Sequence, residues 1–121
     1  MSWRSERGAA TIWVLGLGAV VLSVAMVVAA RGSAVLARHR LERAADLTAL
    51  AAAQQIGRTV QPCAAASRIA AANAAVLVSC AAQLEASGRS GTVTVILRGT
   101  VSFPLIGART LTSPSRAGRM P

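Results

Sequence analysis

The chain has 121 residues, of which 13 are basic and four are acidic, for a formal net charge of +9. The basic residues are scattered arginines and Phe103 is the only aromatic residue after Trp13, so the bases of a nucleic acid would find no stacking surface and no nucleic-acid partner is expected. Four acids, one histidine and no tyrosine leave few catalytic combinations, so we expect no catalysis, cofactor, metal ion or small-molecule substrate.

An uncharged apolar run occupies residues 9–30, behind a short charged leader at residues 1–8. As a helix rising about 1.5 Å per residue, this run spans roughly 33 Å, enough for a hydrocarbon core of about 30 Å. It is longer than the apolar region of a cleaved signal peptide, about 7–15 residues, so we expect a retained transmembrane helix. Its small residues are candidates for close helix packing: Gly16, Gly18, Ala19 and Ser23.

A second interpretation of the same run is a secretion signal. The triplet Val28-Ala29-Ala30 satisfies the small-residue preference of signal peptidase. Cleavage after Ala30 would release a small secreted effector or binding protein, which acts away from the membrane.

The helix is expected to continue over residues 31–57 as a stalk, since SAVLARHRLERAADLTALAAAQQIG consists mostly of strong helix formers. Three leucines lie close to one face at 3.6 residues per turn: Leu36, Leu47 and Leu50. Arg38 and Glu42 have the spacing of an i, i+4 ion pair. Gly57 predicts the end of the helix.

Residues 58–112 predict a small head with one short helix and two or three antiparallel strands, an α+β arrangement. The helix is AAASRIAAANAAV, and the strands are AVLVSCAAQLEA, TVTVILRG and TVSFPLI, the last ending near Pro104. The first strand is expected to place alternate residues on one face: Val76, Val78, Cys80, Ala82 and Leu84. A turn is expected at Arg98-Gly99. The tail at residues 113–121 is expected to be disordered.

Two cysteines, Cys63 and Cys80, are the only ones in the chain. A disulfide between them would close a 17-residue loop, which the entropic model values at about 3 kcal/mol. Such a bond indicates an oxidising compartment and hence an extracytoplasmic head with a cytoplasmic N-terminus. Two unrelated buried thiols are the alternative.

The arginines after the apolar run favour the opposite orientation. Arg31, Arg38, Arg40 and Arg43 follow the run, whereas Arg4 and Arg7 precede it. The positive-inside rule alone would keep the C-terminal side in the cytoplasm. We give the cysteines more weight, because a long translocated domain can override local charge.

Two segments resemble proteins of pilus assembly. Gly8, followed directly by Ala9 and the apolar helix, looks like the prepilin-peptidase junction of type IV pilin-like proteins. LERAADLTALAAAQQI resembles the helix motif of the TadE/TadG-like family of Flp (tight-adherence) pilus-assembly proteins, and IAAANAAVLVSC with TVTVILRG is similar to the head of its short actinobacterial members. The residues that carry the helix motif are Ala44, Ala45, Asp46, Ala49, Leu50 and Ala51.

The resemblance implies a single-pass membrane protein with a pilin-like head, a minor pilin or pseudopilin of a pilus or secretion apparatus. Its partners would be the lipid bilayer and other membrane subunits of the assembly. Such pilins usually carry glutamate at the fifth residue after the cleavage glycine, where this chain has Trp13. Processing between Gly8 and Ala9 and an uncleaved anchor are therefore both open. Asp46 has two interpretations, a contact with another subunit or an ion pair with Arg43, of which we favour the ion pair.

Overall fold

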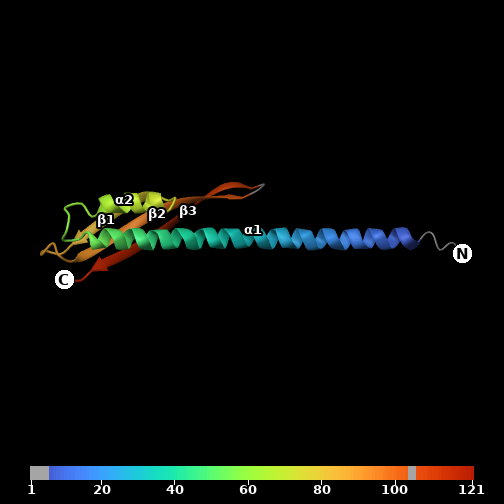
Figure 1. The fold of residues 1–121 in the computed structure, drawn as a ribbon, viewed down its shortest axis with the longest axis horizontal. Helices are drawn as coiled ribbons and strands as arrows, with labels where there is room; N and C mark the ends of the chain where they lie inside the picture. The colour runs from blue at the N-terminus through green and yellow to red at the C-terminus, as the bar shows by residue number, and fades with distance from the viewer. Residues whose placement is uncertain (1–5, 104–105) are drawn as a thin grey trace. The chain divides into compact units, whose positions relative to one another are not determined.

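A computed structural model describes residues 6–103 and 106–121, with side-chain surroundings from residue 8 onward. Its elements in chain order are α1 (Glu6–Gln54), α2 (Cys63–Ala72), β1 (Val76–Leu84), β2 (Gly91–Phe103) and β3 (Gly107–Arg119), as Figure 1 shows. A long N-terminal helix, a short helix and a three-stranded antiparallel sheet confirm the predicted α+β class. The first five leader residues and Pro104 lie outside the described residues.

The chain divides into two units, residues 1–35 and residues 36–121, and α1 begins in the first and ends in the second. In the first unit, 12 large apolar side chains from Ile12 to Val28 are each between 55% and 81% exposed. They lie on all sides of the helix, so no face of this segment is suited to water. The segment therefore needs lipid or protein around it.

The second unit is built on a sheet with strand order β1-β2-β3. The central strand β2 pairs with β3 over its whole length, from Gly91 opposite Arg119 to Phe103 opposite Gly107. Because side chains alternate across a strand, Val93, Val95 and Leu97 all point to one face, where they are completely buried. This face carries the core of the unit.

Both helices of this unit cover the same face of the sheet. Val95 lies opposite Cys80 in β1 and opposite Ser115 in β3, so the three side chains share a face. Cys80 is disulfide-bonded to Cys63 at the start of α2, and the Ser115 hydroxyl donates a 2.6 Å hydrogen bond to Asp46 in α1. The result is a two-layer arrangement, with α1 and α2 on one side of the sheet.

The end of α1 is held by Gly57 and by a distant arginine. Gly57 has a φ of +76°, the left-handed conformation that terminates helices, as the sequence predicts. Arg119, at the end of β3, donates from Nη1 to the carbonyl oxygens of Gln54 at 3.3 Å and Ile56 at 2.9 Å. These carbonyls have no partner further along the helix, so the arginine satisfies them and places a positive charge at the C-terminal end of the helix.

The predicted disordered tail at residues 113–121 is wrong, because β3 runs from Gly107 to Arg119 and pairs throughout with β2. Leu111, Ser113, Ser115 and Ala117 share the face that meets the helices. Pro114 is accommodated because β3 is an edge strand, where a missing N–H is tolerated.

The predicted turn at Arg98-Gly99 is also wrong, since β2 continues through both residues to Phe103. Gly99 instead allows a side chain of α1 to come close to the strand. A Cβ at Gly99 would lie 3.2 Å from Cδ1 of Leu41, so the missing side chain makes room for a leucine of α1. A glycine inside a strand often marks such an approach of another element.

The predicted face of the first strand is only partly correct. An irregularity between Leu77 and Ser79 shifts the register of β1, so that Leu77 and Cys80 pack against the core. Val76 and Val78, expected beside Cys80, are instead 57% and 51% exposed. A β-bulge of this kind inserts one residue and reverses the faces of the residues before it.

The disulfide between Cys63 and Cys80 confirms the pairing expected from the sequence, with Cα atoms 5.9 Å apart. It ties the first residue of α2 to the middle of the edge strand β1. Most of the unit's large core side chains come from β2 and α1, so the bond holds α2 to a core that is rich in alanine.

Replacing both cysteines, Cys63→Ser with Cys80→Ser, is expected to lower the free energy of unfolding by about 3 kcal/mol, because the unfolded chain regains the entropy of a 17-residue loop. The measurement is urea unfolding of the full-length protein in detergent. Alkylation before and after reduction is the control, and two thiols that react freely without reductant in the wild-type protein would contradict the bond.

Enlarging the alanine face of α1 is expected to destabilise the second unit. Ala45 has no exposed surface, so Ala45→Leu should cost about 1–3 kcal/mol or more by overpacking. Ala71→Leu, the same change at an exposed position of α2, is the matched control and should change stability by less than about 0.5 kcal/mol. Equal effects in denaturant unfolding would contradict the packing described for α1.

Candidate functional site

Helix α1 has a buried face between residues 36 and 54 that consists mainly of alanines. The buried residues are Leu41, Ala44, Ala45, Thr48, Ala49, Ala52 and Ala53. Thr48 is the one polar residue among them, and its hydroxyl donates within the helix to the carbonyl of Ala44 at 2.7 Å. Because alanine side chains are short, the helix backbone can lie close to the valines of β2.

The motif residues identified in the sequence divide between two environments. Ala44, Ala45 and Ala49 belong to the buried core, whereas Leu50 is 50% exposed and Asp46 is exposed. The alanines of the motif therefore have a structural role, which is to fit the helix against its own sheet. Leu50 is not part of this core and lies half exposed on another side of the helix.

The three leucines expected on one helix face do share a face, but that face does not pack on the core. Leu36, Leu47 and Leu50 are 52%, 53% and 50% exposed. Sequence periodicity predicted that the three leucines share a helix face. It could not decide whether this leucine face or the alanine face would pack on the sheet. The sheet takes the alanine face.

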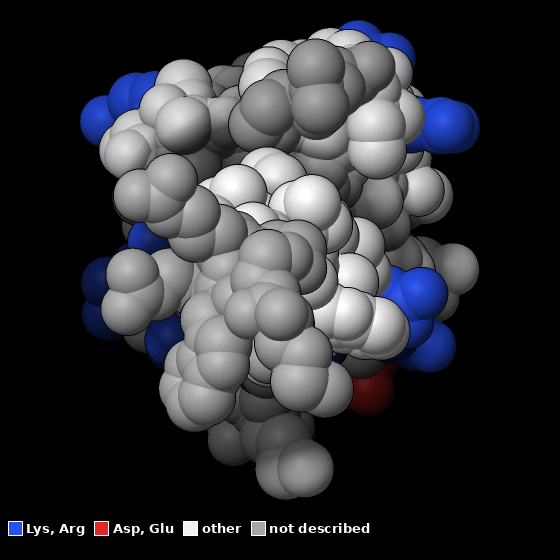
Figure 2. All heavy atoms as spheres, turned by 90° about the vertical axis from the view of Figure 1, so that its right-hand side faces the viewer, with Lys and Arg blue, Asp and Glu red and all other residues white. Residues whose placement is uncertain are grey.

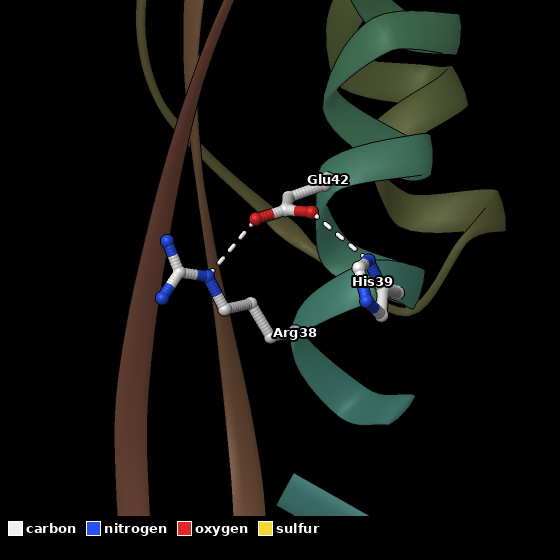
Figure 3. Close-up of polar contacts among 3 residues, drawn as sticks. All are labelled: Arg38, His39 and Glu42. Atoms are coloured by element: carbon white, nitrogen blue, oxygen red, sulfur yellow. Dashed lines mark hydrogen bonds and ion pairs between the residues drawn. The ribbon is translucent and has the colours of Figure 1, made fainter. Parts of the chain in front are cut away.

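A small polar cluster lies on α1 at Arg38, His39 and Glu42 (Figure 3). Nε of Arg38 donates a 2.9 Å hydrogen bond to Oε1 of Glu42, and Nδ1 of His39 lies 3.2 Å from Oε2. The hydrogen bond from Arg38 is the main cause that lowers the pKa of Glu42; desolvation opposes it, and the nearby charges of Arg38 and His39 lower the pKa further. This confirms the predicted i, i+4 pair.

Asp46 has a partner other than the predicted one. Its Oδ1 accepts the hydrogen bond from the Ser115 hydroxyl of β3, and no ion pair with Arg43 is found among the described residues. The prediction overlooked β3, because residues 113–121 were expected to be disordered. Asp46 thus joins α1 to an edge strand of the sheet.

The small residues of the apolar segment fall on two sides of α1. At 100° per residue, Gly16, Ala19 and Ser23 share a face, whereas Gly18 lies on another. The Ser23 hydroxyl donates to the carbonyl of Ala19 at 2.7 Å, so it is satisfied within its own helix. A Cβ built at either glycine meets no atom within 4 Å, which leaves the backbone open to another helix there.

The candidate processing site lies in the same helix. Gly8 and Ala9 are helical and exposed within α1, and Trp13, which stands where a glutamate is usual, is 81% exposed. An exposed tryptophan near the end of an apolar helix is typical of a side chain at the membrane interface.

The described residues contain no grouped set of metal ligands, and the face that Figure 2 shows has no continuous basic patch. Among the described residues, no three histidine, cysteine or acidic side chains are grouped as metal ligands. On the face that Figure 2 shows, the blue arginine side chains form several separate groups.

Comparison with protein-family models identifies one family. The match lies almost entirely in α1 and includes both the apolar run and the alanine face. Residues 8–55 match the model of a family described as putative Flp pilus-assembly TadE/G-like. This stretch of the chain is therefore similar to the TadE/G-like Flp pilus-assembly family. The match covers nearly all of α1, and α2 and the sheet lie outside it. Neither curated proteins nor solved structures gave a match to the chain.

The pKa of Glu42 is expected to rise toward its ordinary value in Arg38→Gln, because the hydrogen bond that lowers it is lost. Arg40→Gln is the control, since Arg40 forms none of the ion pairs found for Glu42 and is not among the causes of its lowered pKa, and should leave the pKa unchanged. Carboxyl NMR titration of the full-length protein in detergent measures both.

The lowered pKa of Glu42 determines in which direction pH changes the free energy of unfolding. The contact stabilises the folded protein above the pKa that Glu42 has in the unfolded chain, and the contribution is lost as pH falls through the folded-state pKa. A Glu42 pKa equal in wild type and Arg38→Gln would contradict the geometry.

Proposed function

We propose that this TadE/G-like protein is a membrane-anchored subunit of a Flp-type pilus or secretion apparatus, a minor pilin or pseudopilin that acts by association and performs no catalysis. The observation that carries the proposal is the composition of α1. One continuous helix contains an apolar run with 12 exposed large side chains and, after it, the family's alanine motif packed on a sheet. Within residues 6–103 and 106–121, one helix has the length and apolarity to cross a membrane.

The proposed topology has a cytoplasmic N-terminus, with residues 36–121 outside the cytoplasm. The disulfide between Cys63 and Cys80 supports this orientation, because such bonds persist in oxidising compartments. The arginines that follow the apolar run oppose it. A translocated unit of this size is not governed by local charge alone.

Contacts within the bilayer would come from the small-residue face of α1. Gly16, Ala19 and Ser23 present little side-chain bulk, and a shallow hollow of about 480 Å³ lies beside Gly16 between Ile12, Trp13, Leu17 and Val20. A helix from another membrane subunit could lie close to the backbone there, gaining dispersion energy that lipid tails do not provide.

The second candidate is a secreted protein cut after Ala30. Residues 36–121 have their own buried core and a disulfide, which favours a unit that folds without the apolar segment. An N-terminal apolar helix also has the properties of a signal sequence.

Intact-mass measurement of the protein from its own cells, after separation into membrane and medium fractions, distinguishes these candidates. We expect the protein in the membrane fraction, extractable only with detergent, because the apolar run is retained. An N-terminus at Ala9 would indicate prepilin-type processing, and one at Met1 or Ser2 would indicate a plain anchor.

Two other results of the same measurement would contradict the anchored subunit. A mature N-terminus at Arg31, with the protein in the medium, would overturn the anchored subunit and support the secreted form. Full-length protein that is soluble in the cytosol, with Cys63 and Cys80 reduced, would overturn both candidates.

A further inference from the structure

The exposed face of α1 in the second unit combines leucines with arginines at regular spacing. Steps of four and three residues connect its members, which we call the α1 stripe: Leu36, Arg40, Arg43, Leu47, Leu50 and Gln54. Every one of them is exposed, and the stripe lies on the side of α1 opposite to the alanines that pack on the sheet. Alternating steps of three and four are those at which one helix packs along another.

The arginines of the stripe have no acidic partner in the described part of the chain. The ion pairs found there involve Glu42 with Arg38 and His39, and neither includes Arg40 or Arg43. An arginine within a helix–helix interface is costly unless a carboxylate meets it. Any protein that covers the leucines must therefore bring acidic side chains.

Three of the chain's four acidic side chains lie where side-chain surroundings are described, and all three are already engaged. Glu42 accepts from Arg38, Asp46 accepts from Ser115, and Glu85 accepts from the hydroxyl of Ser90. None of the three lies on the stripe. A second copy in parallel would place Arg40 against Arg40, so like charges disfavour self-association along this face.

We infer that the α1 stripe is a docking surface for an amphipathic helix of a different protein, one that presents leucine-sized apolar side chains and has aspartate or glutamate opposite Arg40 and Arg43. The inference rests on the proposed role as an assembly subunit and names the chemistry of the partner. The net charge of +9 adds a general attraction for an acidic partner. A layer of anionic lipid headgroups would attract the arginines, but it does not require leucines at helical steps of three and four.

The test is photo-crosslinking in the native cells with the full-length protein. Benzoyl-phenylalanine replaces Leu47 on the stripe or, as the control off the stripe, Val60, which is 96% exposed. We expect the Leu47 probe, and not the Val60 probe, to attach to a peptide of another protein, with an acidic residue within one helical turn of the attachment point.

Charge reversal then tests the electrostatic part of the inference. Arg40→Glu with Arg43→Glu should lower the crosslink yield more than about tenfold, whereas Arg40→Lys with Arg43→Lys should retain most of it. Arg68→Glu with Arg89→Glu, at exposed positions off the stripe, is the matched control and should change the yield little. If the double reversal reduces the amount of protein, Leu50→Ala serves instead, with both arginines intact, and should also lower the yield.

Several results would overturn the inference: a crosslink to a second copy of this chain, a crosslink to lipid alone, no product from Leu47, or a yield that charge reversal leaves unchanged. The fractionation and N-terminal mass described above are measured on the same cells. If the protein is anchored but gives no crosslink, only the docking role of the α1 stripe is refuted. If the protein is released with an N-terminus at Arg31, the proposed anchored subunit is refuted independently.

Discussion

The burial of the alanine face of α1 in one core with the valines of β2 is the constraint on which the second unit depends. Ala45, Ala49 and Ala52 have no exposed surface, and opposite them Val93 and Val95 are equally buried. Each of these small side chains contributes little, so the stability of the contact depends on the sum of many small contributions. Gly99 of β2 acts in a similar way, because its missing side chain leaves room for Leu41 of α1.

Such a core is small, and connections at its edges compensate. The disulfide from Cys63 to Cys80 secures α2 to β1, the hydrogen bond from Ser115 to Asp46 joins β3 to α1, and Arg119 closes the carbonyl end of α1. Each connection links an edge strand to a helix, and together they surround a core in which most of the helical residues are alanine. In small domains, covalent and polar ties of this kind supplement a limited hydrophobic core.

Helix α1 meets different surroundings along its length and around its circumference. Its N-terminal part is apolar on every side, whereas in the second unit one side packs on the sheet and the other carries the α1 stripe. The TadE/G-like match covers nearly this whole helix, so the matched pattern includes both the exposed apolar run and the alanine face that packs on the sheet. Helix α2 and the sheet complete the core that the motif alanines require.

The sequence alone was sufficient for the features set by local chemistry. These are the apolar run, the helix end at Gly57, the Arg38–Glu42 pair, the second helix, and the pairing of two cysteines with no other candidates. Only the tertiary structure decided which face of α1 is buried, that Gly99 continues a strand, and that the C-terminal residues form β3. Those outcomes depend on contacts between residues distant in the chain, such as Ser115 with Asp46 and Arg119 with Ile56, for which no local periodicity exists. A polar strand containing proline resembles a loop until a neighbouring strand satisfies its backbone.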